Sequence, residues 1–290
     1  MKTLVTKVQY KNFEPGEFVD EQKRTYEETI GLIENYPWSI QREKFMIDLT
    51  NPSVTIEGDN GDYLKLAVYY NQKFVLLYLN KDQRLFSRSF STLQDGYAYI
   101  KCFFEQPVFD LTGFRKESTW MQNNVRHFVT QDFRYELTAQ SIKKYWLSVR
   151  GFNIIVPITF LIIITGVVSN AIVLLWPGIL PIWGAIMPLR LFFKYYNYAK
   201  DKILIMSKAN DTFYFGSLGD MVKYDKKDIL KCTIVKSRGS RSIYKGFAVI
   251  KIEFKNGAMV GIPNLLIDHR ALEDKLFQCR KVHEDKSPYL

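Results

Sequence analysis

The chain has 290 residues, of which 47% are hydrophobic and 24% are charged, and it carries a formal net charge of +10. This length fits two folded domains joined by a further segment. The three cysteines are widely spaced and form no CxxC pair, which argues against a disulfide framework or a zinc site and favours reduced thiols. We therefore expect neither a metal nor a cofactor.

The first 140 residues predict an α+β domain. Thr3–Tyr10 is expected to be a strand, followed by a helix that Asp20 caps and that ends near Tyr36. Thr92 and Asp95 match a capping box that opens another helix. Between these helices, four short apolar runs separated by turn residues predict an antiparallel meander: Ser53–Glu57, Tyr63–Tyr70, Phe74–Leu79 and Leu85–Phe90.

This order of helix, meander and capped helix, with YLKLAVYYNQKFVLLYL at 63–79, resembles the small α+β immunity domains of bacterial toxin systems. The resemblance implies that the domain binds a toxin. Aromatic residues are frequent between Tyr69 and Phe104, and they allow two interpretations. They form either a protein-binding face or the core and surface of the sheet.

The middle of the chain is apolar. Gly151–Leu189 contains no charged residue over 39 positions. Its first part is long enough for a helix to cross a bilayer core of about 30 Å, and Pro177-Gly178 then breaks the run. We expect a juxtamembrane helix and a two-helix transmembrane hairpin over residues 141–199, with spans at about 152–176 and 179–196. The alternative is a buried helical hairpin of a soluble protein.

The flanks of this segment predict its orientation. No Asp or Glu occurs from Leu137 to Lys200. The positive-inside rule then places both termini in the cytoplasm, so we expect a multi-pass protein of the bacterial inner membrane. The expected membrane-interface residues are the basic and aromatic side chains near the ends of the spans: Lys143, Lys144, Arg150, Trp176, Trp183, Arg190 and Lys194.

Residues 200–290 predict six or seven short strands and a final helix over about Leu265–Val282. Three stretches carry a resemblance to the bacterial pleckstrin-homology-like (PH-like) superfold: KDILKC at 227–232, FAVIKIEFKNG at 247–257 and the helix after GIPN at 261–264. The resemblance implies a β-barrel or sandwich with a closing helix. It also implies a module that binds lipids or peptides rather than an enzyme.

A basic cluster lies within this part of the chain. No acidic residue occurs from Ile229 to Ile252. Arginine guanidinium groups and backbone N–H groups of the SRGSRS segment at 237–242 suit a phosphate or a carboxylate. The alternative is an ordinary solvated hairpin tip. The candidate lipid-binding or partner-binding residues are Lys231, Lys236, Arg238, Arg241 and Lys245.

No catalytic signature is present, since the sequence lacks GxxxxGK[ST], HExxH and GxSxG. His127, His269 and His283 are isolated, and we expect them to be surface or core histidines. A basic chain can bind nucleic acid, but a membrane surface is the simpler partner here. We therefore expect a non-enzymatic binding protein.

Together these patterns predict an α+β membrane protein with domains at 1–140, 141–199 and 200–290. The favoured function is a membrane-anchored immunity protein that binds and neutralises a cognate bacterial toxin. The alternative is a membrane adaptor or sensor whose PH-like domain binds lipid or a partner peptide. The expected partners are the lipid bilayer, a toxin and anionic head groups.

Overall fold

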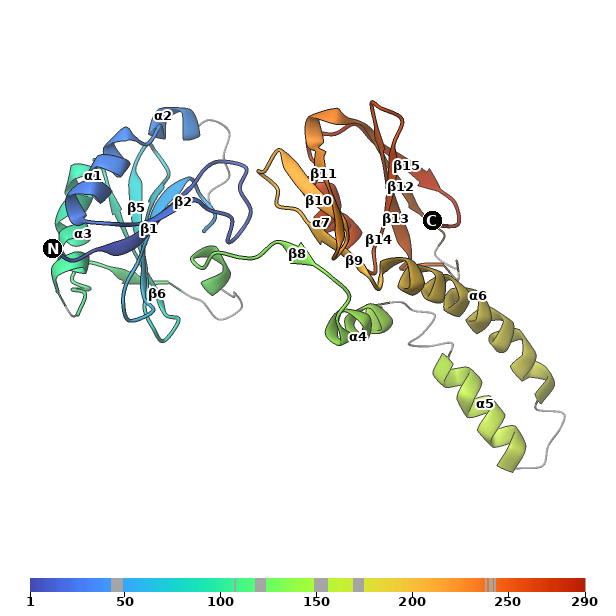
Figure 1. The fold of residues 1–290 in the computed structure, drawn as a ribbon. Helices are drawn as coiled ribbons and strands as arrows, with labels where there is room; N and C mark the ends of the chain where they lie inside the picture. Colours follow the sequence, from blue (N-terminus) through green and yellow to red (C-terminus); the bar gives the residue numbers. More distant parts are fainter. Residues whose placement is uncertain are drawn as a thin grey trace. The chain divides into compact units, whose positions relative to one another are not determined.

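The computed structural model describes residues 1–42, 49–106, 108–117, 124–148, 156–168, 175–237, 239, 242 and 244–289. The chain forms two compact units, Met1–Asp132 and Phe133–Leu290, and each is described by itself (Figure 1). The predicted division at residues 140 and 200 stays a prediction.

The first unit is built on a seven-stranded antiparallel sheet with the order β2-β1-β3-β4-β5-β6-β7. The predicted meander is confirmed, because β3 to β6 pair in chain order. Strand β2 was not expected, since its VDEQKR sequence is polar and lies exposed at the sheet edge. The strands are β1 (Leu4–Gln9), β2 (Val19–Arg24), β3 (Ser53–Glu57), β4 (Tyr63–Val68), β5 (Phe74–Leu79), β6 (Leu85–Phe90) and β7 (Arg115–Lys116).

Helices α1 (Tyr26–Asn35) and α3 (Gln94–Glu105) cover one face of this sheet, where Ile33, Ile100 and Leu64 belong to one buried core (Figure 1). Burying such side chains is the main stabilising contribution to the unit. The short helices α2 (Trp38–Gln41) and η1 (Val125–His127) complete the described helical elements of the unit.

The capping boxes decide where the two long helices begin. Helix α1 starts later than predicted, because Thr25 and Glu28 form the capping box and Asp20 lies in β2. The predicted box before α3 is present. The Thr92 N–H donates to the Asp95 carboxylate at 3.1 Å, and the Asp95 N–H donates to the Thr92 hydroxyl at 3.4 Å.

The opposite face of the sheet carries buried polar residues. Lys7, Thr55 and Lys65 are neighbours across β1, β3 and β4, and none is more than 1% exposed. Phe128, in the segment after η1, packs with Tyr63 on this face. The segment from residue 124 to 130 therefore covers part of the second face, with polar as well as apolar contacts.

The second unit contains two four-stranded sheets, in the orders β11-β10-β9-β8 and β14-β13-β12-β15. The core between them joins Phe213 and Phe215 of the first sheet to Ile234, Ile250 and Ile252 of the second. The strands are β8 (Arg134–Tyr135), β9 (Lys202–Ile205), β10 (Thr212–Ser217), β11 (Asp220–Asp225), β12 (Ile229–Lys236), β13 (Ala248–Phe254), β14 (Met259–Pro263) and β15 (Lys281–Asp285), with the 3₁₀ turn η4 (Lys226–Asp228) before β12.

The closing helix is shorter than predicted. Helix α7 spans His269–Lys275, and Asp268 caps it by accepting a hydrogen bond from the Arg270 N–H. The chain then turns and returns as β15, which runs parallel to β12. The predicted helix over Leu265–Val282 is thus wrong at both ends, because its last residues pair with a strand instead.

Among the described residues between β8 and β9, the chain forms the helices α4 (Ala139–Ser148), α5 (Val156–Val168) and α6 (Leu175–Ala199). The C-terminal part of α6 packs against the second sheet, with Leu191 and Tyr195 beside Val235 and Phe247. Helix α5 runs alongside the N-terminal part of α6 (Figure 1).

The predicted transmembrane hairpin is wrong. Among the helices formed by the described residues, none combines the length and the apolar character needed to cross a membrane. Helix α5 has 13 residues, a rise of about 20 Å, against the 20 or so residues that a span needs. Helix α6 has 25 residues, but its sequence contains three prolines and runs on into Arg190 and Lys194. This finding also contradicts the transmembrane classification and the multi-pass location in the inner membrane.

Candidate functional site

The end of the chain meets helix α6 and the turn before β13. The Tyr195 hydroxyl donates to the carbonyl oxygen of Pro288 at 2.5 Å, and the hydroxyls of Tyr244 and Tyr289 lie 3.1 Å apart. The Lys194 ammonium group lies 5.2 Å from the centre of the Tyr289 ring, within the range of a cation–π contact. We call these five residues the C-terminal junction.

Asn264, directly after β14, holds the turn of the junction in place. Its side-chain amide donates to the Gly246 carbonyl at 2.6 Å, and its side-chain oxygen accepts from the Ala248 N–H at 3.0 Å. The Tyr145 hydroxyl of α4 donates to the same oxygen at 3.4 Å. Gly246 has φ = 100°, a conformation that favours glycine. The Asn264 side chain therefore connects helix α4 and the turn before β13 to the end of β14 by hydrogen bonds.

Burial keeps the phenols of this region neutral. It raises the pKa of Tyr145 well above its ordinary value, and it also raises the pKa of Tyr195. Both side chains therefore act as hydrogen-bond donors at any ordinary pH. The junction is therefore a structural connection between the residues after β15, helix α6 and the turn before β13.

Four basic residues of the second unit, Arg190, Lys194, Lys236 and Lys245, are called the rim. Arg190 and Lys194 are exposed on α6, while Lys236 ends β12 and Lys245 follows Tyr244, both half-buried. Two acid-free stretches supply these residues, 137–200 and 229–252. Asp285 of β15 lies opposite Lys236 and is an acidic neighbour in the sheet register. This set of residues, with Asp285 included, is thus predominantly basic.

Exposed apolar side chains lie on α6 and on α5. Phe193 of α6 is 56% exposed, next in sequence to Lys194. On α5, Phe160 is 64% exposed and Leu161 is 67% exposed. A contiguous exposed apolar patch beside polar residues would mark an interaction surface.

The structure brings only some of the predicted site residues together. Lys194 belongs to the junction, and Lys245 directly follows its Tyr244 in sequence. Lys236 lies at the end of β12, opposite Asp285. Lys231 lies elsewhere, on the outer face of the second sheet, where it forms an ion pair with Glu253 at 2.9 Å and lines a depression of about 240 Å³.

The other predicted site residues fall into two groups. Lys143 is exposed on α4, and Arg190 is exposed on α6. Arg150, Arg238 and Arg241 lie outside the described residues, as do the side chains of Lys144, Trp176 and Trp183.

Sequence reasoning missed Tyr244, Asn264 and Tyr289. Tyr244 lies within the predicted basic cluster, so its position between Arg241 and Lys245 was a usable signal. Tyr289 gave no signal, because its role depends on contacts with residues far away in the sequence.

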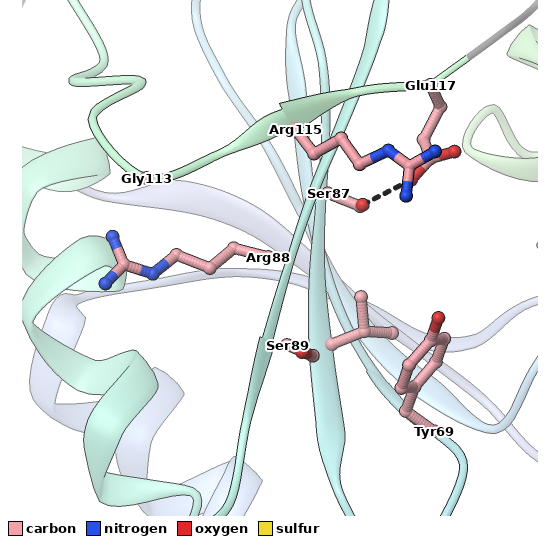
Figure 2. Close-up of a pocket in the computed structure, with 8 residues that line it drawn as sticks. Tyr69, Ser87, Arg88, Ser89, Gly113, Arg115 and Glu117 are labelled. Atoms are coloured by element: carbon pink, nitrogen blue, oxygen red, sulfur yellow. Dashed lines mark hydrogen bonds between the residues drawn. The ribbon is translucent and has the colours of Figure 1, made fainter.

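The first unit has a groove of its own at the β6–β7 side of the sheet, with a volume of about 350 Å³ (Figure 2). The Ser87 hydroxyl donates to the Glu117 carboxylate at 2.5 Å, and Arg115 lies beside this pair. Arg88 points away from them (Figure 2) and donates to the Thr112 carbonyl at 2.7 Å. Ser87, Glu117 and Arg88 are thus engaged in hydrogen bonds within the unit, and their arrangement does not indicate a particular reaction.

The aromatic residues of the first unit are mostly structural. Phe74, Tyr78, Phe103 and Phe104 are all less than 10% exposed and belong to the core under α1 and α3. Tyr70 is 59% exposed. The interpretation as core and sheet surface thus accounts for most of this set.

The second unit combines two sheets with a helix that follows β14. Seven strands, β8 to β14, thus precede the capping helix α7. Residues 134–275, from the start of β8 to the end of α7, match a family model described as a PH domain. The C-terminal part of the chain therefore contains a PH-like domain, as its sequence resemblance implied, and helices α4 to α6 lie inside the matched range.

No curated protein and no solved structure matches the chain. The resemblance of the first unit to immunity domains gains no support from the family match, which begins after it. That resemblance stays a prediction.

Proposed function

We propose that the chain is a binding protein rather than an enzyme and that its PH-like domain binds the surface of bilayers containing anionic lipids. PH-like domains bind lipids or proteins, and the observation that favours lipid is the composition of the rim. Basic residues lie beside exposed apolar side chains, as Lys194 and Phe193 do on α6. Surfaces that bind at a lipid interface combine these two features.

The expected energies support a reversible association. A basic residue close to an anionic surface contributes about 1 kcal/mol, so Arg190, Lys194, Lys236 and Lys245 together contribute about 4 kcal/mol. Insertion of an exposed side chain such as Phe193 into the interface adds about 1–3 kcal/mol. The electrostatic part weakens in salt, because exposed charges are screened.

The test compares two variants of the full-length protein with equal loss of charge. The first replaces the rim residues: Arg190→Ala, Lys194→Ala, Lys236→Ala and Lys245→Ala. The control replaces four exposed lysines of the first unit: Lys23→Ala, Lys73→Ala, Lys81→Ala and Lys116→Ala. Circular dichroism confirms that each variant is folded.

Both variants are sedimented with vesicles of phosphatidylcholine and phosphatidylserine. We expect the rim variant to lose affinity at least about tenfold and the control to bind as the parent does. Equal binding by both variants would rule out the rim as the lipid-binding surface. Capture of an acidic protein by the parent, without vesicle binding, would favour a protein ligand instead.

The toxin-neutralising function predicted from the sequence would need a partner surface on the first unit. The groove beside Ser87 and Glu117 is polar and internally paired, and it does not identify such a partner. We therefore base the proposed function on the PH-like domain alone.

A further inference from the structure

Two cysteines meet in the PH-like domain. Cys232 of β12 is 1% exposed, and Cys279, in the turn between α7 and β15, packs against the same core. The two thiols shift each other's pKa. The Cys232 N–H also donates to the Arg280 carbonyl at 2.8 Å, which fixes the turn against β12. Both cysteines are free thiols.

The surroundings make the two thiols unequal. Interaction with the Cys232 thiol lowers the pKa of Cys279 to about 7, and the charges of Lys226 and Lys281 act in the same direction. Interaction with Cys279, together with burial, raises the pKa of Cys232. Cys279 is also the more accessible of the pair. A partly exposed thiolate beside a buried thiol has the properties of an attacking and a resolving cysteine.

We propose that Cys232 and Cys279 form a reversible disulfide when the protein meets hydrogen peroxide. The Cys279 thiolate attacks one peroxide oxygen, the O–O bond breaks and hydroxide leaves, which gives a sulfenic acid at Cys279. The Cys232 sulfur then attacks the Cys279 sulfur and the S–O bond breaks. The hydroxide that leaves takes the Cys232 proton as water. Two thiols lose two electrons in total, and one peroxide is reduced to two waters.

The disulfide would join β12 to the segment that leads into β15. These two strands already pair, with Cys232 opposite Lys281. The bond would close a loop that contains β13, β14 and α7. Such a loop restricts the unfolded chain, so the oxidised protein should resist unfolding more than the reduced protein.

Cys102 provides an internal control. It lies on α3 in the other unit, where its thiol donates to the Gln106 side chain at 2.9 Å. The full-length protein is treated with hydrogen peroxide, its free thiols are alkylated, and its peptides are mapped without reduction. We expect a linked peptide that contains Cys232 and Cys279, with Cys102 alkylated. Treatment with dithiothreitol should restore both thiols.

The Cys102→Ser variant should form the same linked peptide, because Cys102 takes no part in the reaction. Recovery of Cys232 and Cys279 in separate peptides, with both alkylated or with Cys279 alone oxidised, would overturn the proposal. Disulfides through Cys102 in place of the predicted link would overturn it as well.

Discussion

The Tyr195 hydroxyl donates to the carbonyl oxygen of Pro288 across 93 positions of sequence. The Tyr195 side chain is fully buried where α6 packs against Val235 and Phe247. The hydrogen bond therefore connects this buried cluster to residue 288 of the chain. Pro288 directly precedes Tyr289, which reaches Tyr244 and Lys194. Lys194, one of the basic residues proposed to bind lipid, is therefore linked to Pro288 and Tyr289 through these contacts.

Replacing this phenol by Phe should destabilise the PH-like domain. Tyr195→Phe keeps the ring and leaves the Pro288 carbonyl without its donor. We expect the free energy of unfolding in urea to fall by about 1–2 kcal/mol. The control is Tyr214→Phe, at a residue that is 38% exposed, and it should change stability by less than about 0.5 kcal/mol. Equal effects of the two variants would mean that the buried bond contributes little.

Lys65 should be essential for the stability of the first unit. Its ammonium group donates to the Gln9 side chain at 3.1 Å, to the Leu49 carbonyl at 3.0 Å and to the His127 carbonyl at 2.6 Å. Lys65→Met removes these donors from buried acceptors, so we expect a loss of about 2–4 kcal/mol in urea denaturation. Lys73→Met, at an exposed position, is the control. Parent-like stability of Lys65→Met would contradict this role.

His127 should make the first unit sensitive to acid. Its Nδ1 lies 2.7 Å from the Thr50 hydroxyl, and burial with the nearby Lys65 charge lowers its pKa from 6.5 to about 4. Because the unfolded state takes up the proton first, this stabilisation is complete above pH 6.5 and is lost as the pH falls toward 4. The expected loss is about 2–3 kcal/mol.

The pH effect is measured as the difference in unfolding free energy between the parent and His127→Gln across this range. His283→Gln, at an exposed position, should keep the pH dependence of the parent. If His127→Gln retains the full decline between pH 6.5 and 4, carboxylates rather than His127 cause it.

The β10–β11 hairpin should depend on a glycine at one position. A Cβ at Gly216 would lie 2.1 Å from the Asp220 carbonyl oxygen, whereas a Cβ at Gly219 would meet nothing within 4 Å. Gly216→Ala should therefore cost about 2 kcal/mol or more, and Gly219→Ala should cost less than about 0.5 kcal/mol. Thermal unfolding of the two variants measures this difference, and equal midpoints would contradict it.

Local signals account for the elements that the sequence predicted correctly. The meander from β3 to β6 follows from alternating apolar residues and turn residues, and α3 follows from the box of Thr92 and Asp95. Strands β2 and β15 lack such signals. Their residues are mostly polar, and they become strands because neighbouring strands offer unpaired edges.

The errors in the middle of the chain have a different cause. The apolar character of Gly151–Leu189 was used to predict membrane-spanning helices, but it does not determine the length of each helix. Helix α5 accounts for 13 described residues of this run. The site was predictable only in part, since charge pointed to Lys194 and Lys245, while the contact of Tyr195 with Pro288 joins residues that no local pattern relates.

Binding of the PH-like domain to anionic lipid is tested most directly by sedimentation of the full-length parent with two kinds of vesicle, at low and at high salt. One kind contains phosphatidylserine, and the other contains phosphatidylcholine alone. We predict binding that requires phosphatidylserine and that falls as salt is raised. Equal binding to both kinds of vesicle, or no binding to either by the folded protein, would contradict the proposed function.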